Sequence, residues 1–248
     1  MGPAKTIDDV LRELDGVLAE ARRTDSRIGY FAALYHKVTV AVRDGIAAGE
    51  FDDGPRMEIL DVNFANRYLL ALDDFRKGRV EIHAWDLAFR ACDRWMPIVV
   101  QHLLLAMNAH INLDLGIAAA QTCPGPEIED LRDDFNKING LLASLVDEVK
   151  AELAQIWRPL GPLDRLSGNI EDVAVNFSMT KARDAAWALS TELAGQDPDA
   201  QAETIARRDR WATTFGHTCL NPPIGRLALF LIRLGERRDV SENIEILV

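Results

Sequence analysis

Residues 97–120 bring together the polar side chains of this sequence that best suit acid–base or metal chemistry. The segment reads PIVVQHLLLAMNAHINLDLGIAAA and contains no Lys, Arg or Glu. If it is a helix, His110 and Asp114 are four residues apart and lie on one face, about one turn from each other. An imidazole oriented by a carboxylate is a common general acid or base in enzymes. We therefore expect His110 and Asp114 to be catalytic residues.

The same two side chains are potential metal ligands. Imidazole plus carboxylate suits zinc or non-haem iron, provided that another helix supplies a third ligand. A regular helix separates His102 from His110 by about 12 Å along its axis, so these two imidazoles could not share one ion. The sequence lacks the H-E-x-x-H and Glu-x-x-His motifs, so the metal hypothesis rests on His110 and Asp114. The candidates for the third ligand are His36, His102, Asp61 and Asp134.

Further polar residues in and near this segment could bind a small molecule. Asn108 and Asn112 form a second pair four residues apart, on roughly the opposite face from His110. Amides and a guanidinium offer hydrogen bonds to a polar or anionic group. Helical bundles build ligand sites from side chains that face their interior. We expect the ligand-binding residues to be Asn108, Asn112, Asn66, Arg67 and His102.

A competing interpretation gives these residues a structural role. Buried polar groups need partners, and a buried carboxylate needs a charge, a metal or a proton. Asp114 would then accept hydrogen bonds from Arg67 or Arg183, and His110 would bond a neighbouring side chain. The chain would be a non-catalytic ligand-binding or interaction protein rather than a small-molecule enzyme. A cavity that reaches His110 from solvent favours the enzyme, whereas a closed network favours the structural role.

Helices must position these groups, because apolar residues recur with a helical period along nearly the whole chain. Thr6 and Asp9 form a capping-box pattern, and Pro97 fits the first turn of the central helix. We expect one domain, residues 1–248, folded as a compact all-α bundle of about nine helices with a buried central helix near 97–121. The expected helices are 6–23, 27–48, 56–77, 80–95, 97–121, 127–157, 170–194, 198–215 and 222–235, with a connector over 158–169 and a C-terminal IEILV that docks on the body.

The composition narrows the classes of partner. The formal net charge is −11, and no Lys/Arg stripe with interleaved aromatic residues occurs, which argues against nucleic acid. The central segment approaches the length of a membrane span, but it carries too many polar groups for a lipid-facing helix. The three cysteines form no C-x-x-C pair, and the N-terminus lacks the apolar region of a secretory signal. We expect a cytoplasmic protein whose partner is a small molecule.

Several stretches resemble the motifs of a bacterial domain-of-unknown-function family. They are QHLLLAMNAHINLDLGIAA, FAALYHKVT, LDVNFANRYL, DFNKIN and ARDAAW, and together they cover most of the chain. The family has no established activity. The resemblance therefore implies a helical fold and leaves the chemistry to be argued from the residues themselves.

Overall fold

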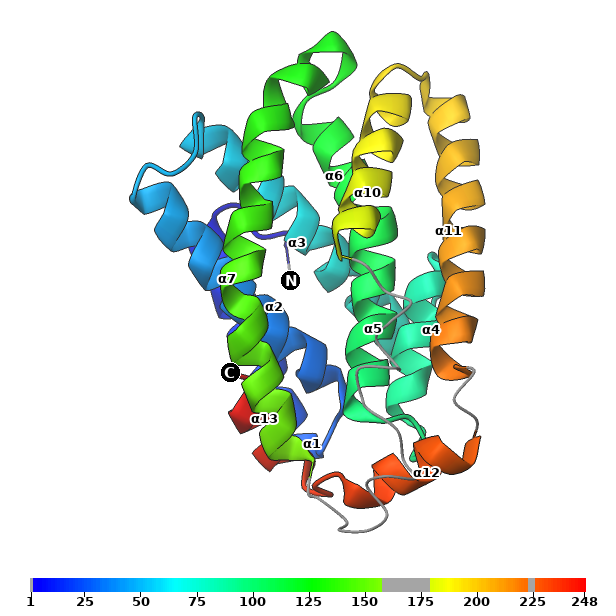
Figure 1. The fold of residues 1–248 in the computed structure, drawn as a ribbon. Helices are drawn as coiled ribbons and strands as arrows, with labels where there is room; N and C mark the ends of the chain where they lie inside the picture. The colour runs from blue at the N-terminus through cyan, green and yellow to red at the C-terminus, as the bar shows by residue number, and fades with distance from the viewer. Residues whose placement is uncertain (1, 158–178, 223–225) are drawn as a thin grey trace.

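Helices form almost all of the part of the chain that the computed structural model describes, which is residues 2–157, 179–222 and 226–248. The expectation of an all-α fold is confirmed. Figure 1 shows the helices gathered into an elongated bundle. Their bounds are α1 (Ile7–Thr24), α2 (Ile28–Ala47), α3 (Gly54–Arg76), α4 (His83–Cys92), α5 (Val99–Ala109), the π turn η1 (His110–Asp114), α6 (Leu115–Thr122), the 3-10 helix η2 (Gly125–Leu131), α7 (Arg132–Ile156), α10 (Met179–Ala194), α11 (Pro198–Leu220), α12 (Arg226–Gly235) and α13 (Val240–Leu247).

The central helix consists of α5, η1 and α6, which follow one another without a break over Val99–Thr122. It is long and apolar enough to cross a membrane by length and composition, but 94% of its most apolar window is buried inside the protein. Helices α2, α4 and α11 pack on α5, while α3 and α10 pack on α6. Because it is covered on all sides, this helix is the core of the bundle rather than one of its faces.

A π turn interrupts the central helix at His110–Asp114, which includes the two residues best suited to acid–base or metal chemistry. The backbone N–H of Leu115 donates to the carbonyl oxygen of His110, five residues earlier. The helical period alone predicts a regular helix here, so this turn was not expected. Such turns insert an extra residue into a helix and are frequent at functional sites.

The starts of three helices follow directly from local sequence. At α1, Thr6 Oγ1 accepts from the N–H of Asp9 at 3.1 Å, and Asp9 accepts from the N–H of Thr6 at 3.1 Å, which confirms the expected capping box. Asp53 caps α3, and Asp197 caps α11, each with a proline in the first turn. Caps of this kind satisfy backbone donors that a helix start leaves free.

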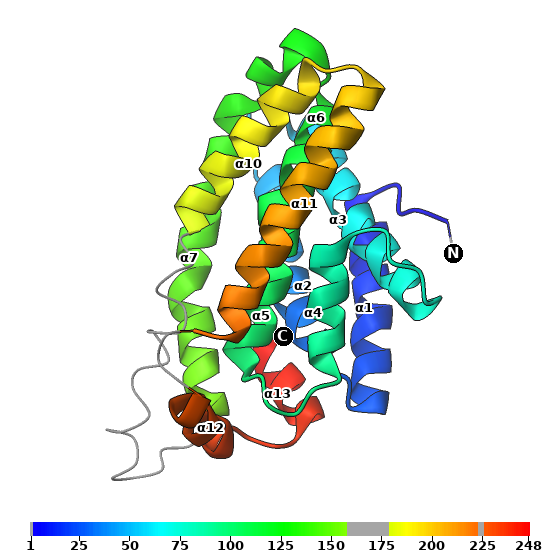
Figure 2. The ribbon, with the colours of Figure 1, turned by 90° about the vertical axis from the view of Figure 1, so that its right-hand side faces the viewer.

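Two glycines allow the outer helices to approach the central one. A Cβ on Gly116 of α6 would lie 2.8 Å from the carbonyl oxygen of Ala186 on α10. A Cβ on Gly216 of α11 would lie 3.4 Å from the side chains of Leu105 and Asn108 on α5, and 2.8 Å from that of Leu87 on α4. Figure 2 shows α10 and α11 lying alongside α5 and α6.

The described residues contain eleven α-helices rather than the nine expected. The π turn divides the central helix into α5 and α6, and the C-terminal tail, expected only to dock, forms α13. This helix contacts α1, α2 and α7, and its Ile244 is fully buried. The expected connector 158–169 and the beginning of the expected helix 170–194 lie outside the described residues.

Candidate functional site

A cavity of about 500 Å³ lies beside the central helix, enclosed by side chains of α2, α3, α5, α7 and α10. Leu, Val, Ile, Met and Phe side chains make up most of its wall. Its lining includes the exposed residues Ala143 and Lys150 of α7, so within the described part of the chain the cavity reaches the surface. The polar or charged residues on the wall are Tyr35, Asp61, His110, Asn139, Lys150, Thr180 and Arg183.

His110 lies on the wall of this cavity within a group of aromatic rings. Its imidazole stacks on Phe64 with ring centroids 3.5 Å apart and meets the ring of Tyr35 edge-on at 4.5 Å. The residue is 3% exposed, and neither ring nitrogen has a hydrogen-bond partner among the described residues. Burial lowers the pKa of His110, so the ring is neutral near pH 7 and one nitrogen can accept a proton.

Asp114 is held in place by two hydrogen bonds. Arg67 Nε donates to Oδ1 at 2.7 Å, and Trp85 Nε1 donates to Oδ2 at 2.7 Å. Burial alone would raise the pKa of Asp114, but the Arg67 charge, His110 and Trp85 together hold it below its usual range. The carboxylate is therefore ionised, although it is 1% exposed.

The structure brings His110 and Asp114 together, as their spacing suggests. His110 Nδ1 lies 3.6 Å from Asp114 Oδ2, which is slightly too long for a hydrogen bond. Arg67 donates to the Asp114 carboxylate, as the structural interpretation anticipates. Arg67, which was expected to bind a ligand, does not line the cavity. Catalytic hydrogen bonds are often long without substrate, so this geometry fits an imidazole that the carboxylate can orient.

Two further polar groups lie on the same part of the wall. Tyr35 Oη and Asp61 Oδ2 are buried and lack a hydrogen-bond partner among the described residues. Burial and the Asp61 carboxylate raise the pKa of Tyr35, and burial followed by nearby Glu58 raises the pKa of Asp61 to about 7. Sequence reasoning gave Tyr35 no role and Asp61 only that of a metal ligand. The sequence signal that could have identified both residues is a polar side chain in an otherwise apolar helical stretch.

The expected asparagine ligands lie elsewhere and have partners inside the protein. Asn108 Nδ2 donates to the carbonyl oxygen of Ala212 on α11 at 2.7 Å, and Asn112 Nδ2 donates to Asn108 Oδ1 at 3.1 Å. Asn66 makes two hydrogen bonds with the backbone of Ala4 and holds the N-terminal segment against α3. None of these asparagines lines the cavity. Their described contacts are those of structural residues.

The remaining histidine candidates are also separated from His110. His102 lies two turns earlier, with Nδ1 at 3.9 Å from Cys92 Sγ, and burial lowers its pKa to about 3. It does not line the cavity. His36 pairs with Asp15 at 3.2 Å. Among the described residues, no group of three His, Cys, Asp or Glu side chains could hold a metal ion.

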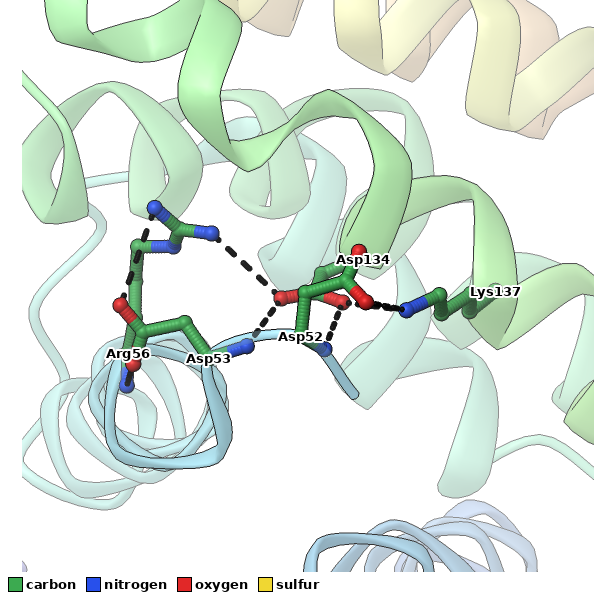
Figure 3. Close-up of polar contacts among 5 residues, drawn as sticks. All are labelled: Asp52, Asp53, Arg56, Asp134 and Lys137. Atoms are coloured by element: carbon green, nitrogen blue, oxygen red, sulfur yellow. Dashed lines mark hydrogen bonds and ion pairs between the residues drawn. The ribbon is translucent and has the colours of Figure 1, made fainter. Parts of the chain in front are cut away.

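Asp134, the last metal candidate, instead joins α7 to the turn before α3 (Figure 3). Its carboxylate accepts from the backbone N–H groups of Asp52 and Asp53 at 2.7 and 2.9 Å. Lys137 lies 3.2 Å and Arg56 3.4 Å from it. Burial alone would raise the pKa of Asp134, but the two backbone N–H groups and Lys137 lower it. The side chain is a structural link between helices.

Fold and site together define an all-α protein with a largely apolar cavity beside a buried central helix. The chain belongs to the family of unknown function DUF5995, which it matches over residues 7–222. This match confirms the expected membership of a family of unknown function. No curated protein and no solved structure matches the chain.

Proposed function

We propose that this protein binds a small, largely apolar organic molecule in the cavity and acts on it through His110. The observation that carries the proposal is a cavity of about 500 Å³ whose wall holds buried polar atoms without partners. Ligand pockets commonly enclose about 300–1,000 Å³ and combine apolar walls with a few polar groups. A dry cavity of about 150 Å³ already holds benzene, so a considerably larger molecule fits here.

The unpaired atoms on the wall support a ligand with a hydrogen-bonding group. Leaving a buried donor or acceptor without a partner costs about 1–3 kcal/mol, and a ligand that satisfies it recovers this free energy. Tyr35 Oη, Asp61 Oδ2 and His110 Nε2 are three such atoms, and all three residues line the cavity. A carbonyl or hydroxyl group of the ligand would meet them there.

His110 is the residue proposed to react. The neutral imidazole would accept a proton from the bound molecule, and the nearby ionised Asp114 would stabilise the resulting imidazolium. The competing function is non-catalytic ligand binding, and the observation in its favour is that both oxygens of Asp114 already accept hydrogen bonds. Mass spectrometry of ligands extracted from wild type and His110→Gln separates the two. Different molecules in the two extracts support catalysis, and identical molecules support binding alone.

Calorimetric titration with 1-decanol, a neutral apolar probe, tests the binding function. We expect one molecule to bind per chain. Val38→Phe places a larger side chain on the cavity wall and should weaken binding about tenfold or more. The matched control is Val80→Phe, because Val80 is 43% exposed and does not line this cavity. Absence of binding to wild type, or equal loss in both variants, would overturn the proposal.

A metal-assisted form of the reaction needs a ligand beyond His110 and Asp114. Among the described residues no third donor is placed to complete such a set. Elemental analysis of untagged protein, purified without chelators, tests this form of the proposal. Stoichiometric zinc or iron that is lost in His110→Ala would support it, and protein free of both metals would remove it.

The proposed partner is a small molecule rather than nucleic acid or a membrane, and the proposed location is the cytoplasm. The formal net charge of −11 supports the first point, since a polyanion would be repelled. The burial of the central helix inside the protein supports the proposed location in the cytoplasm rather than in a membrane. Cell fractionation checks the location, and an electrophoretic shift of DNA or RNA would contradict the proposed partner.

A further inference from the structure

Arg183 is a buried cation on the wall of the cavity. It lies on α10, is 5% exposed, and stacks over the ring of Phe135 at 4.5 Å. Its Nε donates to Asn139 Oδ1 at 2.5 Å, and Nη2 donates to the carbonyl oxygen of Phe135 at 2.5 Å. A guanidinium has five N–H donors. Within the described residues these are its hydrogen-bond partners, so the guanidinium keeps further donors for a ligand in the cavity.

No carboxylate of the described residues forms an ion pair with Arg183. The structure gives ion pairs to many other arginines, including Arg67, Arg79 and Arg233. The charge of Asp184 favours the protonated form of Arg183, but no ion pair joins the two side chains. Burial lowers the pKa of Arg183 to about 10, so the side chain is charged near pH 7. A buried charge without an opposite charge is strongly destabilising.

Asp61 does not neutralise Arg183 from across the cavity. The charge that acts on Asp61 is Glu58, and the charges that act on His110 are Asp114 and Arg67. No hydrogen bond or ion pair among the described residues joins Arg183 to Asp61 or His110. The cavity therefore has two distinct polar regions, one around His110 with Tyr35 and Asp61, and one around Arg183 on α10 beside α7.

We propose that Arg183 anchors the carboxylate of an apolar ligand, so that the molecule bound in the cavity is a hydrophobic carboxylic acid. This inference rests on the proposed binding function and specifies its ligand class. The planar guanidinium matches a carboxylate, which can accept two parallel hydrogen bonds from it. The apolar walls would then enclose the hydrocarbon part of the ligand. Lys150 also lines the cavity, but its side chain is 67% exposed, and a solvated ammonium contributes little.

Decanoate and 1-decanol, which share a chain length, test the proposal by calorimetric titration at pH 7.5. Wild type should bind decanoate about tenfold more tightly than the alcohol, since hydrogen bonds between two charged groups are stronger than those to a neutral hydroxyl. Binding of the alcohol with no preference for the acid would overturn the carboxylate proposal and leave the binding function standing. If neither probe binds, both are overturned. This comparison uses wild type alone and does not depend on the folding of any variant.

Variants then locate the preference. Arg183→Gln should reduce decanoate affinity about tenfold and leave decanol affinity within a factor of about two. Arg208→Gln is the matched control. Like Arg183, Arg208 stacks on an aromatic ring (Trp211, at 4.5 Å) and donates to a backbone carbonyl (Asn112, at 2.7 Å). Unlike Arg183, it does not line the cavity. Lys150→Gln should keep the preference. Loss of the preference in Lys150→Gln, or its retention in folded Arg183→Gln, would refute the role of Arg183.

Discussion

Arg67 of α3 donates a 2.7 Å hydrogen bond from Nε to Oδ1 of Asp114 on the central helix. Arg67 is partly exposed, whereas the carboxylate is almost completely buried. The second oxygen accepts from Trp85 of α4, so one side chain joins three helices. The ion pair therefore contributes to the fold whatever chemistry His110 performs.

Asp114→Asn should destabilise the protein by about 2–4 kcal/mol at pH 7. The amide keeps the shape of the carboxylate, but it removes the charge opposite Arg67 and places N–H donors against other donors. Urea unfolding followed by circular dichroism measures the change. Asp133→Asn, an exposed acid on α7, is the control and should change stability by less than about 0.5 kcal/mol. A stabilised Asp114→Asn would instead mark a carboxylate retained for function at the expense of stability.

His110→Phe should leave the free energy of unfolding unchanged or raise it by about 1 kcal/mol. The phenyl ring can keep the stack on Phe64, and the change removes two buried nitrogens that have no partner among the described residues. Ligand turnover should be lost in the same variant. A destabilisation above about 2 kcal/mol would show that the imidazole has a structural partner.

Asn108→Leu provides the opposite case within the same helix. This change removes the donor to the Ala212 carbonyl and the acceptor of Asn112, so two buried groups lose their partners. We expect a loss of about 2–4 kcal/mol with ligand affinity unchanged. Thermal unfolding and decanol titration of the same samples give both values. Weaker ligand binding in folded Asn108→Leu would show that Asn108 contributes to the ligand site.

Asp61→Asn should stabilise the protein at pH 8 and have little effect at pH 4. The pKa of Asp61 is raised to about 7, so the folded state binds its proton more tightly than the unfolded state. The stabilising effect of that proton is present below the unfolded pKa and is lost as the pH rises from about 4 to 7. The asparagine variant does not undergo this loss. A shift from 3.8 to about 7 corresponds to about 4 kcal/mol, so the variant should be more stable than wild type by up to about this amount at pH 8. Urea unfolding over this pH range checks it, with Asp133→Asn as control.

Asp134→Asn should show the opposite pH dependence. The pKa of Asp134 is lowered in the folded state, so its contribution is present above the unfolded pKa and is lost as the pH falls through the folded pKa. Wild type should therefore lose stability below about pH 4. The variant should be about 1–3 kcal/mol less stable at pH 7 and lose less on acidification. Equal acid sensitivity in the two proteins would contradict the link shown in Figure 3.

The sequence by itself determined the helical class, several helix starts and the burial of the central segment. These features depend on residues that are close in the sequence. Thr6 and Asp9 of the capping box are three positions apart, and every turn of the segment 97–120 is rich in apolar residues. The closeness of His110 to Asp114 has the same origin, because residues four apart on a helix are always neighbours. Local spacing also explains the pairing of Asn108 with Asn112, although it cannot tell a structural pair from a ligand site.

Only the tertiary structure decided where the cavity lies and which polar groups face it. Tyr35, Asp61 and His110 come from three different helices, and Arg183 meets the carbonyl of Phe135 from 48 residues away. The same packing gives Asn66, His102 and Asp134 partners outside the cavity. The helical period of a sequence indicates which face of each helix is apolar. It does not state how far apart two such faces lie, and that separation decides whether a polar atom finds a partner or faces an open space.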